Sequence, residues 1–452
     1  MNSDTIAAVS TATGTAAIAI VRMSGHDAVK IAKAVFYPCN DFKSHRIYYG
    51  KIIDPASREP IDEVMIAAML SPKSYTGEDM VEIYCHGGIF VTSKVLELLM
   101  KNGASAAEPG EFTKRAYLNG KIDLLRAEAV NEIINARTEA ALKIAQRQLR
   151  GSMSERFALL RKKLLLMSAQ IEVAIDHPDD GYFSDYDKLC RETAAIKEEL
   201  QKFYESYDIG LKLREGFNIA IVGRPNVGKS TLFNQLLGDG RAIVTAIPGT
   251  TRDAIDAQIS LTGKTAKLTD TAGIRDNAGE IEKIGIAKSW NETEKADLIL
   301  WVIDKSSMFD ENDEIIMKRL AGSDKKVIAV LNKQDKPSVF DKSILMQSMK
   351  IIEISAKYCE KIENLKKMIS AEIDIRKDID DYNIITTIRQ KQKISEALSL
   401  ISELSLHIKE RYGDEIIGAD LLSIVSVLDE FIGKISNDEV LETVFSNFCV
   451  GK

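Results

Sequence analysis

The string Gly223-Arg-Pro-Asn-Val-Gly-Lys229-Ser230-Thr231 matches the phosphate-binding pattern G-x-x-x-x-G-K-[ST]. It follows an apolar run, FNIAIV, and precedes a segment of helical character, STLFNQLL, which is the context that this motif requires. In such a loop the glycines let backbone N–H groups approach phosphates closely. Lys229 brings a positive charge to the β- and γ-phosphates, and the Ser230 hydroxyl can bind Mg²⁺. The motif therefore predicts a nucleoside triphosphate site.

Three later strings, each at or after the end of an apolar run, offer groups that would bind the nucleotide base and the metal. Asp270-Thr-Ala-Gly273 offers a carboxylate for Mg²⁺ and a backbone N–H for the γ-phosphate. Asn332-Lys-Gln-Asp335 offers a carboxylate that can accept from guanine N1–H and the 2-amino group. Adenine lacks both donors, so this carboxylate selects GTP over ATP. Ser355-Ala-Lys357 is expected to close over the base.

The segment from Arg241 to Asp253, RAIVTAIPGTTRD, is the expected switch loop. Thr250 or Thr251 would sense Mg²⁺ and the γ-phosphate there. Ile274 follows the third motif, where Ras-like proteins carry the glutamine that orients water. Isoleucine cannot orient water. Hydrolysis is therefore either very slow or assisted by another group.

The pattern of apolar residues and turns changes three times along the sequence, which predicts a multidomain α/β protein. Residues 1–118 mix short β-like runs with turns, as in a small α+β domain. Residues 119–213 and 376–452 show helical periodicity, which predicts one discontinuous all-α domain. Residues 214–375 alternate strands and helices, as in a doubly wound sheet of a Ras-like P-loop GTPase domain inserted into the helical one. The expected strands cover 16–25, 64–70, 80–88, 217–223, 257–261, 266–270, 297–304, 326–332 and 350–355.

Composition fits a protein without a membrane span. The chain has 452 residues, 45% of them hydrophobic, and no run of 18 apolar residues. Its start does not have the pattern of a signal peptide. Five scattered cysteines without a Cys-x-x-Cys pair favour a reducing, cytoplasmic setting. The net charge is −7, yet residues 111–163 carry 12 Lys/Arg against 6 Asp/Glu; this basic strip either faces phosphates or is a solvated helix face.

Outside the GTPase motifs, unusual strings near both ends resemble the tRNA-modification GTPase MnmE (TrmE) family over nearly the whole chain. They are Thr76-Gly-Glu-Asp-Met-Val-Glu82, His86-Gly-Gly88, Pro109-Gly-Glu-Phe-Thr-Lys-Arg-Ala116, Leu118-Asn-Gly-Lys121-Ile-Asp123 and Phe448-Cys-Val-Gly-Lys452. Val450 stands where the family often has Ile or Leu.

The resemblance implies an activity and its partners. Family members are homodimers whose N-terminal domain is similar to folate-binding domains and holds a tetrahydrofolate derivative, 5-formyl- or methylene-tetrahydrofolate. With an FAD-dependent MnmG-like (GidA-like) protein they form a heterotetramer. This complex adds a carboxymethylaminomethyl-type group at C5 of wobble uridine 34 in certain tRNAs. Potassium-dependent dimerisation of the G domains drives GTP hydrolysis.

The resemblance also implies residue roles. Folate would contact Arg22, Glu82, Lys121 and Lys452. Mg²⁺ would be held by Ser230 and Thr251, and K⁺ by Asn226, Thr245, Ile247 and Thr250. Glu282 would take over the water-orienting role. Cys449 either has a chemical role or is a small buried hydrophobe. The predicted GTP-binding set is Asn226, Val227, Gly228, Lys229, Ser230, Thr231, Thr245, Ala246, Ile247, Pro248, Gly249, Thr250, Thr251, Asp270, Thr271, Ala272, Gly273, Asn332, Lys333, Asp335, Ser355, Ala356 and Lys357.

Two other functions remain open from the sequence alone. One is a ribosome-assembly GTPase switch without tRNA chemistry; such a protein would be expected to carry an RNA-binding module, and no G-x-x-G clamp in a suitable basic context is apparent. The other is a folate-binding enzyme in which the GTPase domain only regulates.

Overall fold

The computed structural model describes residues 4–38, 41–136, 138–177, 184–238, 256–261, 264–270, 293–345, 349–373, 384–435 and 438–452. The chain forms two compact units: one contains residues 1–134, 145–201 and 392–452, and the other contains residues 135–144 and 202–391. Within the described ranges, no helix combines the length and apolar character needed to cross a bilayer.

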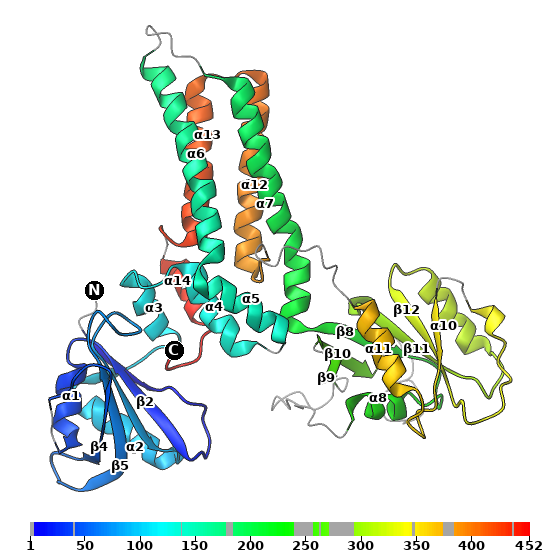
Figure 1. Ribbon diagram of the computed structural model, residues 1–452, viewed down its shortest axis with the longest axis horizontal. Helices are drawn as coiled ribbons and strands as arrows, with labels where there is room; N and C mark the ends of the chain where they lie inside the picture. The colour runs from blue at the N-terminus through cyan, green and yellow to red at the C-terminus, as the bar shows by residue number, and fades with distance from the viewer. Residues whose placement is uncertain are drawn as a thin grey trace, which may run out of the picture. The chain divides into compact units, whose positions relative to one another are not determined.

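The N-terminal region is a seven-stranded sheet in the order β3-β4-β5-β6-β2-β1-β7. Its strands alternate buried and open side chains, so that Val81, Ile83 and Cys85 enter the core while Glu82 and Tyr84 face away. Helices α1 and α2 cover the core face (Figure 1). The elements are β1 (Thr5–Val9), β2 (Ile18–Ser24), α1 (Ala28–Val35), β3 (Phe36–Tyr37), β4 (Arg46–Ile53), β5 (Pro60–Met69), β6 (Met80–His86), α2 (Ile89–Lys101), β7 (Ala104–Ala106) and α3 (Glu111–Leu118).

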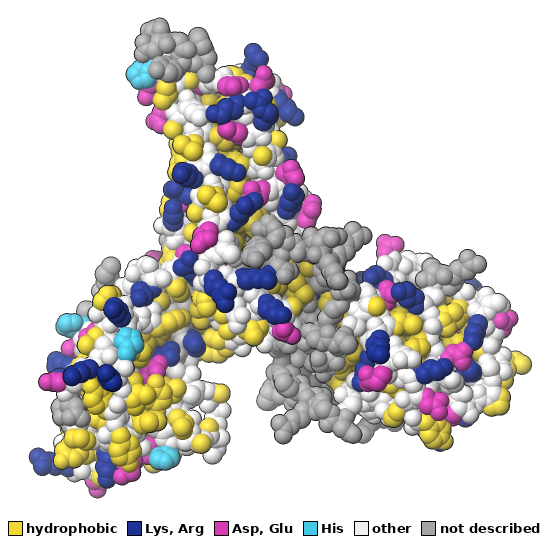
Figure 2. Space-filling view, in the orientation of Figure 1, with side chains coloured by type: hydrophobic (Ala, Val, Ile, Leu, Met, Phe, Trp, Pro, Cys, Tyr) yellow, Lys and Arg dark blue, Asp and Glu magenta, His cyan; other side chains and the backbone are white. Residues whose placement is uncertain are grey.

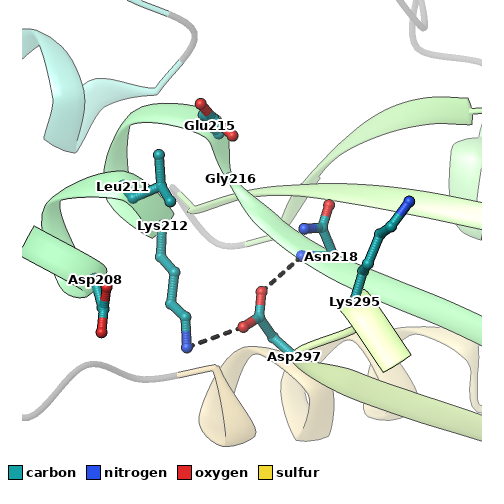
Figure 3. A pocket seen from close by; sticks show the side chains of 8 residues that line it. All are labelled: Asp208, Leu211, Lys212, Glu215, Gly216, Asn218, Lys295 and Asp297. Carbon is teal, nitrogen blue, oxygen red and sulfur yellow. Dashed lines mark hydrogen bonds and ion pairs between the residues drawn. The ribbon is translucent and has the colours of Figure 1, made fainter. Parts of the chain in front are cut away.

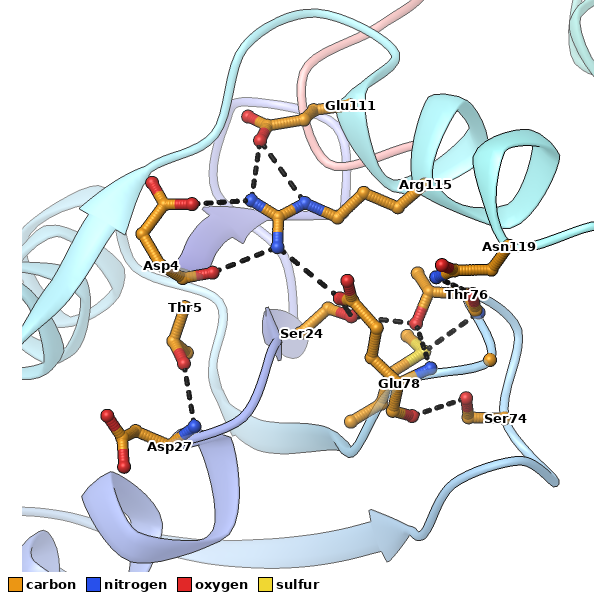
Figure 4. Close-up of polar contacts among 12 residues, drawn as sticks. Asp4, Thr5, Ser24, Asp27, Ser74, Thr76, Glu78, Glu111, Arg115 and Asn119 are labelled. Atoms are coloured by element: carbon orange, nitrogen blue, oxygen red, sulfur yellow. Dashed lines mark hydrogen bonds and ion pairs between the residues drawn. The ribbon is translucent and has the colours of Figure 1, made fainter. Parts of the chain in front are cut away.

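A buried ion network attaches α3 to this sheet (Figure 4). The Arg115 guanidinium, 8% exposed, donates to Glu111 at 2.8 Å, to the Asp4 carboxylate at 3.1 Å and to Glu78 at 3.4 Å. Ser24 Oγ donates to the same Glu78 oxygen at 2.8 Å. Glu78 and Arg115 belong to two of the unusual strings, which therefore have a structural role in joining helix to sheet.

Replacing Arg115 with Met should destabilise this region by about 3 kcal/mol, because three partly buried carboxylates lose a buried cation. Hydrogen exchange of the β1 and α3 amides would measure the loss. Lys114→Met, at the half-buried neighbouring position, is the control and should change exchange little. Adding Glu78→Gln to the Arg115 variant should restore part of the stability, and a further loss in that double variant would contradict the network's role.

The helical region contains long helices that pack side by side. Helices α6 and α13 run together, joined by the Arg161–Asp429 ion pair and by stacking of Phe157 on Phe431 at 4.1 Å (Figure 1). Helix α12 is joined to α13 by an ion pair from Lys393. The helices are α4 (Leu124–Asn135), α5 (Glu139–Arg150), α6 (Ser152–Asp176), α7 (Tyr186–Glu215), α12 (Ile388–Glu410), α13 (Asp414–Ile432) and α14 (Asp438–Phe445).

The apolar repeat between Leu124 and Leu149 is divided between α4 and α5. Thr138 lies at the division and its hydroxyl accepts from Ala141 N at 2.8 Å, as a residue that caps a new helix does. The same hydroxyl donates to Leu213 O at 2.7 Å. A side chain that satisfies the first turn of α5 favours a fresh helix start over continuation.

The inserted domain is a six-stranded sheet in the order β13-β12-β11-β8-β10-β9, parallel except for β9. Separate apolar clusters cover its two faces, which makes it doubly wound. The predicted strands are confirmed with small shifts at their ends. The elements are β8 (Phe217–Val222), α8 (Lys229–Leu237), β9 (Asp256–Leu261), β10 (Lys264–Asp270), β11 (Leu298–Asp304), α10 (Glu311–Ala321), β12 (Lys326–Asn332), a 3₁₀ helix η2 (Lys342–Ile344), β13 (Lys350–Glu353) and α11 (Ile362–Glu372).

Candidate functional site: a nucleotide pocket and a docked C-terminus

The phosphate loop joins β8 to α8. Gly228, with φ +100°, leads into the first turn of α8, whose backbone N–H groups favour anions. The Lys229 amino group donates to the carbonyls of Gly223 and Arg224 at 2.8 Å each, so the charge is held inside the loop. Ser230 and Thr231 follow in the same turn with exposed side chains. This donor set suits a polyphosphate.

Asn332 connects the phosphate loop to the loop of Ser355 and Ala356, which is expected to close over the base. Its Nδ2 donates to Val227 O at 2.8 Å, and its Oδ1 accepts from Ala356 N at 2.9 Å. A Cβ at Gly228 would lie 2.3 Å from Asn332 Nδ2, so only glycine fits at this approach. Three of the predicted strings therefore meet through one buried amide.

Lys333 supports the same loop from the side. Its amino group lies 2.6 Å from Asp304 Oδ2 and donates to Asn226 O at 3.1 Å. Desolvation of Asp304 opposes ionisation, but hydrogen bonds from Lys333 and Ser306 prevail and lower its pKa. Sequence reasoning missed Asp304, although its position at the end of the apolar run of β11 was a usable signal.

Asp335 and the loop that contains Ser355 form the expected binding site for the guanine base. Ser355 Oγ donates to Asp335 Oδ1 at 2.6 Å, and this hydrogen bond lowers the pKa of the exposed carboxylate. Ser355 and Ala356 are buried, whereas Lys357 is exposed and lies 4.9 Å from the Tyr358 ring. Asp335 is thus a fixed anionic acceptor at the carboxyl end of the sheet.

The contacts that Arg224 makes beyond the phosphate loop were not anticipated from the sequence either. Its guanidinium pairs with Asp310, the N-cap of α10, contacts Ser307, and lies 3.5 Å from the buried Asp313. Burial raises the pKa of Asp313. The contact ties the phosphate loop to the segment between β11 and α10.

The metal and switch residues are only partly described. Asp270 is the last residue of β10, and its backbone lies beside Ile221 of β8 at the carboxyl edge of the sheet. The following residues of that string, the switch residues 245–251 and Glu282 lie outside the described residues, so their roles stay predictions.

A second candidate site lies on the open face of the N-terminal sheet. Arg22 on β2 faces Glu82 on β6, and its Nε and Nη2 donate to Glu82 Oε1 at 2.9 and 2.7 Å. Tyr84 donates to Glu82 Oε2 at 2.7 Å; burial and this carboxylate raise the pKa of Tyr84 to about 12. The Arg22 guanidinium also lies 5.7 Å from the Phe112 ring centroid. Tyr84 and Phe112 were not anticipated.

The last residues of the chain dock against this pair. Gly451 O accepts from Arg22 Nη1 and from Ser10 Oγ, both at 3.1 Å. Gly110 N donates to Cys449 O at 3.4 Å. Lys452 is half-buried, and desolvation followed by repulsion from Arg22 lowers its pKa. Arg22, Glu82 and Lys452 are therefore brought together.

Lys121 makes its contact at another part of the N-terminal region. Lys121 lies beside the turn at Gly77, where its exposed amino group donates to Pro72 O at 2.9 Å. Cys449 is exposed, which is unlike the small buried hydrophobe that cysteine often is.

A cavity of about 290 Å³ lies at the opposite end of the inserted sheet (Figure 3). Asp297 at its wall accepts from Lys212 at 2.9 Å and from Asn218 N at 3.0 Å, so the carboxylate joins the end of α7 to β8. Because doubly wound sheets bind ligands at their carboxyl ends, this cavity at the amino ends is separate from the nucleotide pocket.

The fold and the pocket define a P-loop GTPase joined to a helical and an α+β region, and the comparisons narrow this class. Residues 5–121 match the family described as GTP-binding protein TrmE N-terminus, and residues 124–449 match the MnmE helical domain. The tRNA modification GTPase MnmE of Thermotoga petrophila is 41% identical over 99% of this chain and 100% of its own length. That of Finegoldia magna is 42% identical with the same coverage. The chain belongs to the MnmE family.

Two solved structures resemble a part of the chain. The G domain of the Thermotoga maritima FeoB iron transporter is 27% identical, with a TM-score of 0.28 over 35% of this chain and 99% of that chain. Aquifex aeolicus Era bound to GDP and AlF4⁻ is 26% identical, with a TM-score of 0.28 over 41% of this chain and 67% of that chain.

Proposed function

We propose that this chain binds and hydrolyses GTP as part of an enzyme that modifies C5 of wobble uridine 34 in tRNA. The observation that carries the GTP assignment is the junction at Asn332, which joins the phosphate loop to the loop of Asp335 and Ser355. The relatives are tRNA modification GTPases over full length, which favours tRNA chemistry over a ribosome-assembly switch.

Deleting the gene should remove the modified wobble uridine from cellular tRNA, and the wild-type gene should restore it. Mass spectrometry of nucleosides from purified tRNA measures this directly. A deletion strain with normal wobble uridines would contradict the proposal and leave the ribosome-assembly or folate-only alternatives. Ribosome profiles of the same strain separate those two.

Mg²⁺ and K⁺ are proposed as the cations of the GTPase site. Ser230 and Thr251 would hold Mg²⁺; Asn226, Thr245, Ile247 and Thr250 would hold K⁺. A monovalent cation there supplies positive charge near the β- and γ-phosphates, as an arginine finger does. Asn226 supports this role, because its side chain is exposed while its carbonyl is held by Lys333.

GTP hydrolysis should therefore be about tenfold or more faster in KCl than in NaCl at equal ionic strength. Asn226→Ala should bring the two rates together. Steady-state phosphate release measures both, and Asn312→Ala, at an exposed position of α10, is the matched control. Equal wild-type turnover in the two salts would rule out the cation role.

Replacing Glu282 with Ala should lower kcat for GTP hydrolysis in the same assay, while the affinity for GTP stays near normal.

A tetrahydrofolate derivative, 5-formyl- or methylene-tetrahydrofolate, is proposed for the N-terminal site. The cations of Arg22 and Lys452 suit its glutamate carboxylates, and Glu82 can accept from pterin donors. Lys121 would extend this set. The folate would supply the one-carbon unit, and the docked Cys449 would lie beside it.

A homodimer through the N-terminal sheet is also proposed. The face of that sheet opposite α1 and α2 exposes Ile47 (64%), Tyr49 (70%) and Met65 (40%). These side chains lie on neighbouring strands, since Tyr49 pairs with Met65, and Met65 with Tyr84. A contiguous apolar patch of this kind is typical of a protein interface. A second copy would cover it beside the folate site.

The remaining partners follow the family. We propose a heterotetramer with an FAD-dependent MnmG-like protein, tRNA as substrate and a cytoplasmic location. Domain boundaries after residues 118, 213 and 375 are proposed as well.

A further inference from the structure

Basic side chains gather over the region of α4 and α5 (Figure 2). Arg147 and Arg150 lie three residues apart and so share one face at the end of α5; Arg150 is exposed and Arg147 half-buried. Within the described ranges no carboxylate pairs with Arg150. Since the whole chain carries a charge of −7, this local positive charge is not a general property of its surface.

A third guanidinium lies at the same place. A Cβ at Gly151, the residue between α5 and α6, would be 2.0 Å from Arg126 Nη2, so Arg126 packs directly over this junction. Its contact with Asp123 is long, at 3.5 Å. Arg126, Arg147 and Arg150 are called the junction arginines below.

The junction arginines are connected to the docked C-terminus by packing. Leu149, between Arg147 and Arg150 in sequence, packs on the apolar cluster that contains Leu124, Phe445 and Phe448. Phe448 directly precedes the residues that reach Arg22 and Gly110. The end of α5 is therefore held beside the segment proposed to take part in tRNA chemistry.

We propose that the junction arginines bind the phosphate backbone of tRNA beside the C-terminal segment; this rests on the proposed function. Guanidinium groups match phosphate oxygens in a fork geometry and release counterions on binding. Contacts to phosphate position a nucleic acid without reading its sequence. A surface next to the terminus would orient the anticodon stem so that the wobble base reaches the folate site.

The test removes two charges and measures binding of purified tRNA to the full chain. The variant Arg147→Gln/Arg150→Gln is compared with Lys162→Gln/Lys163→Gln, which removes the same charge from exposed positions of α6. Affinity is measured by fluorescence anisotropy between 50 and 200 mM KCl, values chosen from the range of roughly 50–200 mM over which phosphate contacts weaken strongly. The arginine variant should bind about tenfold more weakly at 0.1 M salt, and its salt slope should fall by roughly 0.7–0.9 for each lost contact. The lysine variant should stay within about twofold of wild type.

The outcomes separate this surface from the function on which it rests. If wild type binds tRNA and the arginine variant binds equally well, the surface is wrong. Equal weakening by both variants would also overturn it, because the effect would then be diffuse charge. Retained tRNA affinity with lost binding of the FAD-dependent protein would assign the surface to a protein partner instead. A wild-type chain that does not bind tRNA would contradict the proposed function itself. Unchanged GTP hydrolysis in each variant verifies folding.

Discussion

Replacing Asp335 with Asn should lower the affinity for GTP by about a thousandfold and shift preference to xanthosine triphosphate. The carboxylate would accept from guanine N1–H and the 2-amino group, whereas the amide presents a donor to that amino group and leaves it unpaired. Xanthine carries a 2-oxo group at this position, which accepts from the new amide. The Ser355 hydrogen bond, which lowers the pKa of Asp335, keeps the group ionised and oriented in the wild type.

Titration calorimetry with GTP and xanthosine triphosphate measures both affinities. Asp324→Asn removes an equal charge from an exposed position just before β12, at the other end of that strand, and is the control. The control should bind GTP as wild type does. If the Asp335 variant also binds GTP normally, another group selects the base and the role of the Asn332–Asp335 string is wrong.

The parts of the nucleotide pocket that could be predicted are those in which neighbouring residues act together. The phosphate loop is a short continuous string, and its glycines and lysine are separated by fixed steps of backbone. The buried strands of the inserted sheet were also predictable, because strands covered on both faces are continuous apolar runs, as in β11 and β12.

The contacts that support the pocket could not be predicted in this way. Arg224 meets Asp310 across 86 residues, and Lys333 meets Asp304 across 29. Periodicity gives the face of an element but not which distant element lies opposite. The division between α4 and α5 likewise depends on a single side chain, since Thr138 caps the new helix while the apolar repeat continues.

The proposed N-terminal site depends on contacts that the periodicity of the sequence alone does not predict. Arg22 and Glu82 are 60 residues apart, and only pairing of β2 with β6 places them together. Tyr84 had a usable signal, because a residue two positions after Glu82 on a strand must share its face. Phe112 had none, since the packing of α3 decides its contact with Arg22.

Deleting residues 449–452 should reduce tRNA modification about a hundredfold or more while GTP hydrolysis stays near normal. Displacement by about 1 Å of groups that position reactants costs this much. Termini usually tolerate change unless they are docked. Here Gly451 O accepts from Arg22 and Ser10, and Lys452 is near enough to Arg22 and Glu82 for their charges to affect its pKa. Loss of the segment removes a cation and an exposed thiol, and it leaves Arg22 with one acceptor fewer.

Single substitutions divide this effect into docking and chemistry. Gly451→Val should undock the segment, because a Cβ there would lie 2.6 Å from Val9 O, and the φ of +92° is strained for valine. Val450→Ala, at a position 52% exposed, is the matched control. Cys449→Ser and Lys452→Gln should keep the segment docked, and they test whether the thiol or the amine takes part in tRNA modification. Mass spectrometry of wobble uridines from strains carrying each variant gives the result. If the chain without residues 449–452 modifies tRNA at the wild-type rate, the docked terminus has no part in the reaction, and both Cys449 and Lys452 leave the proposed site.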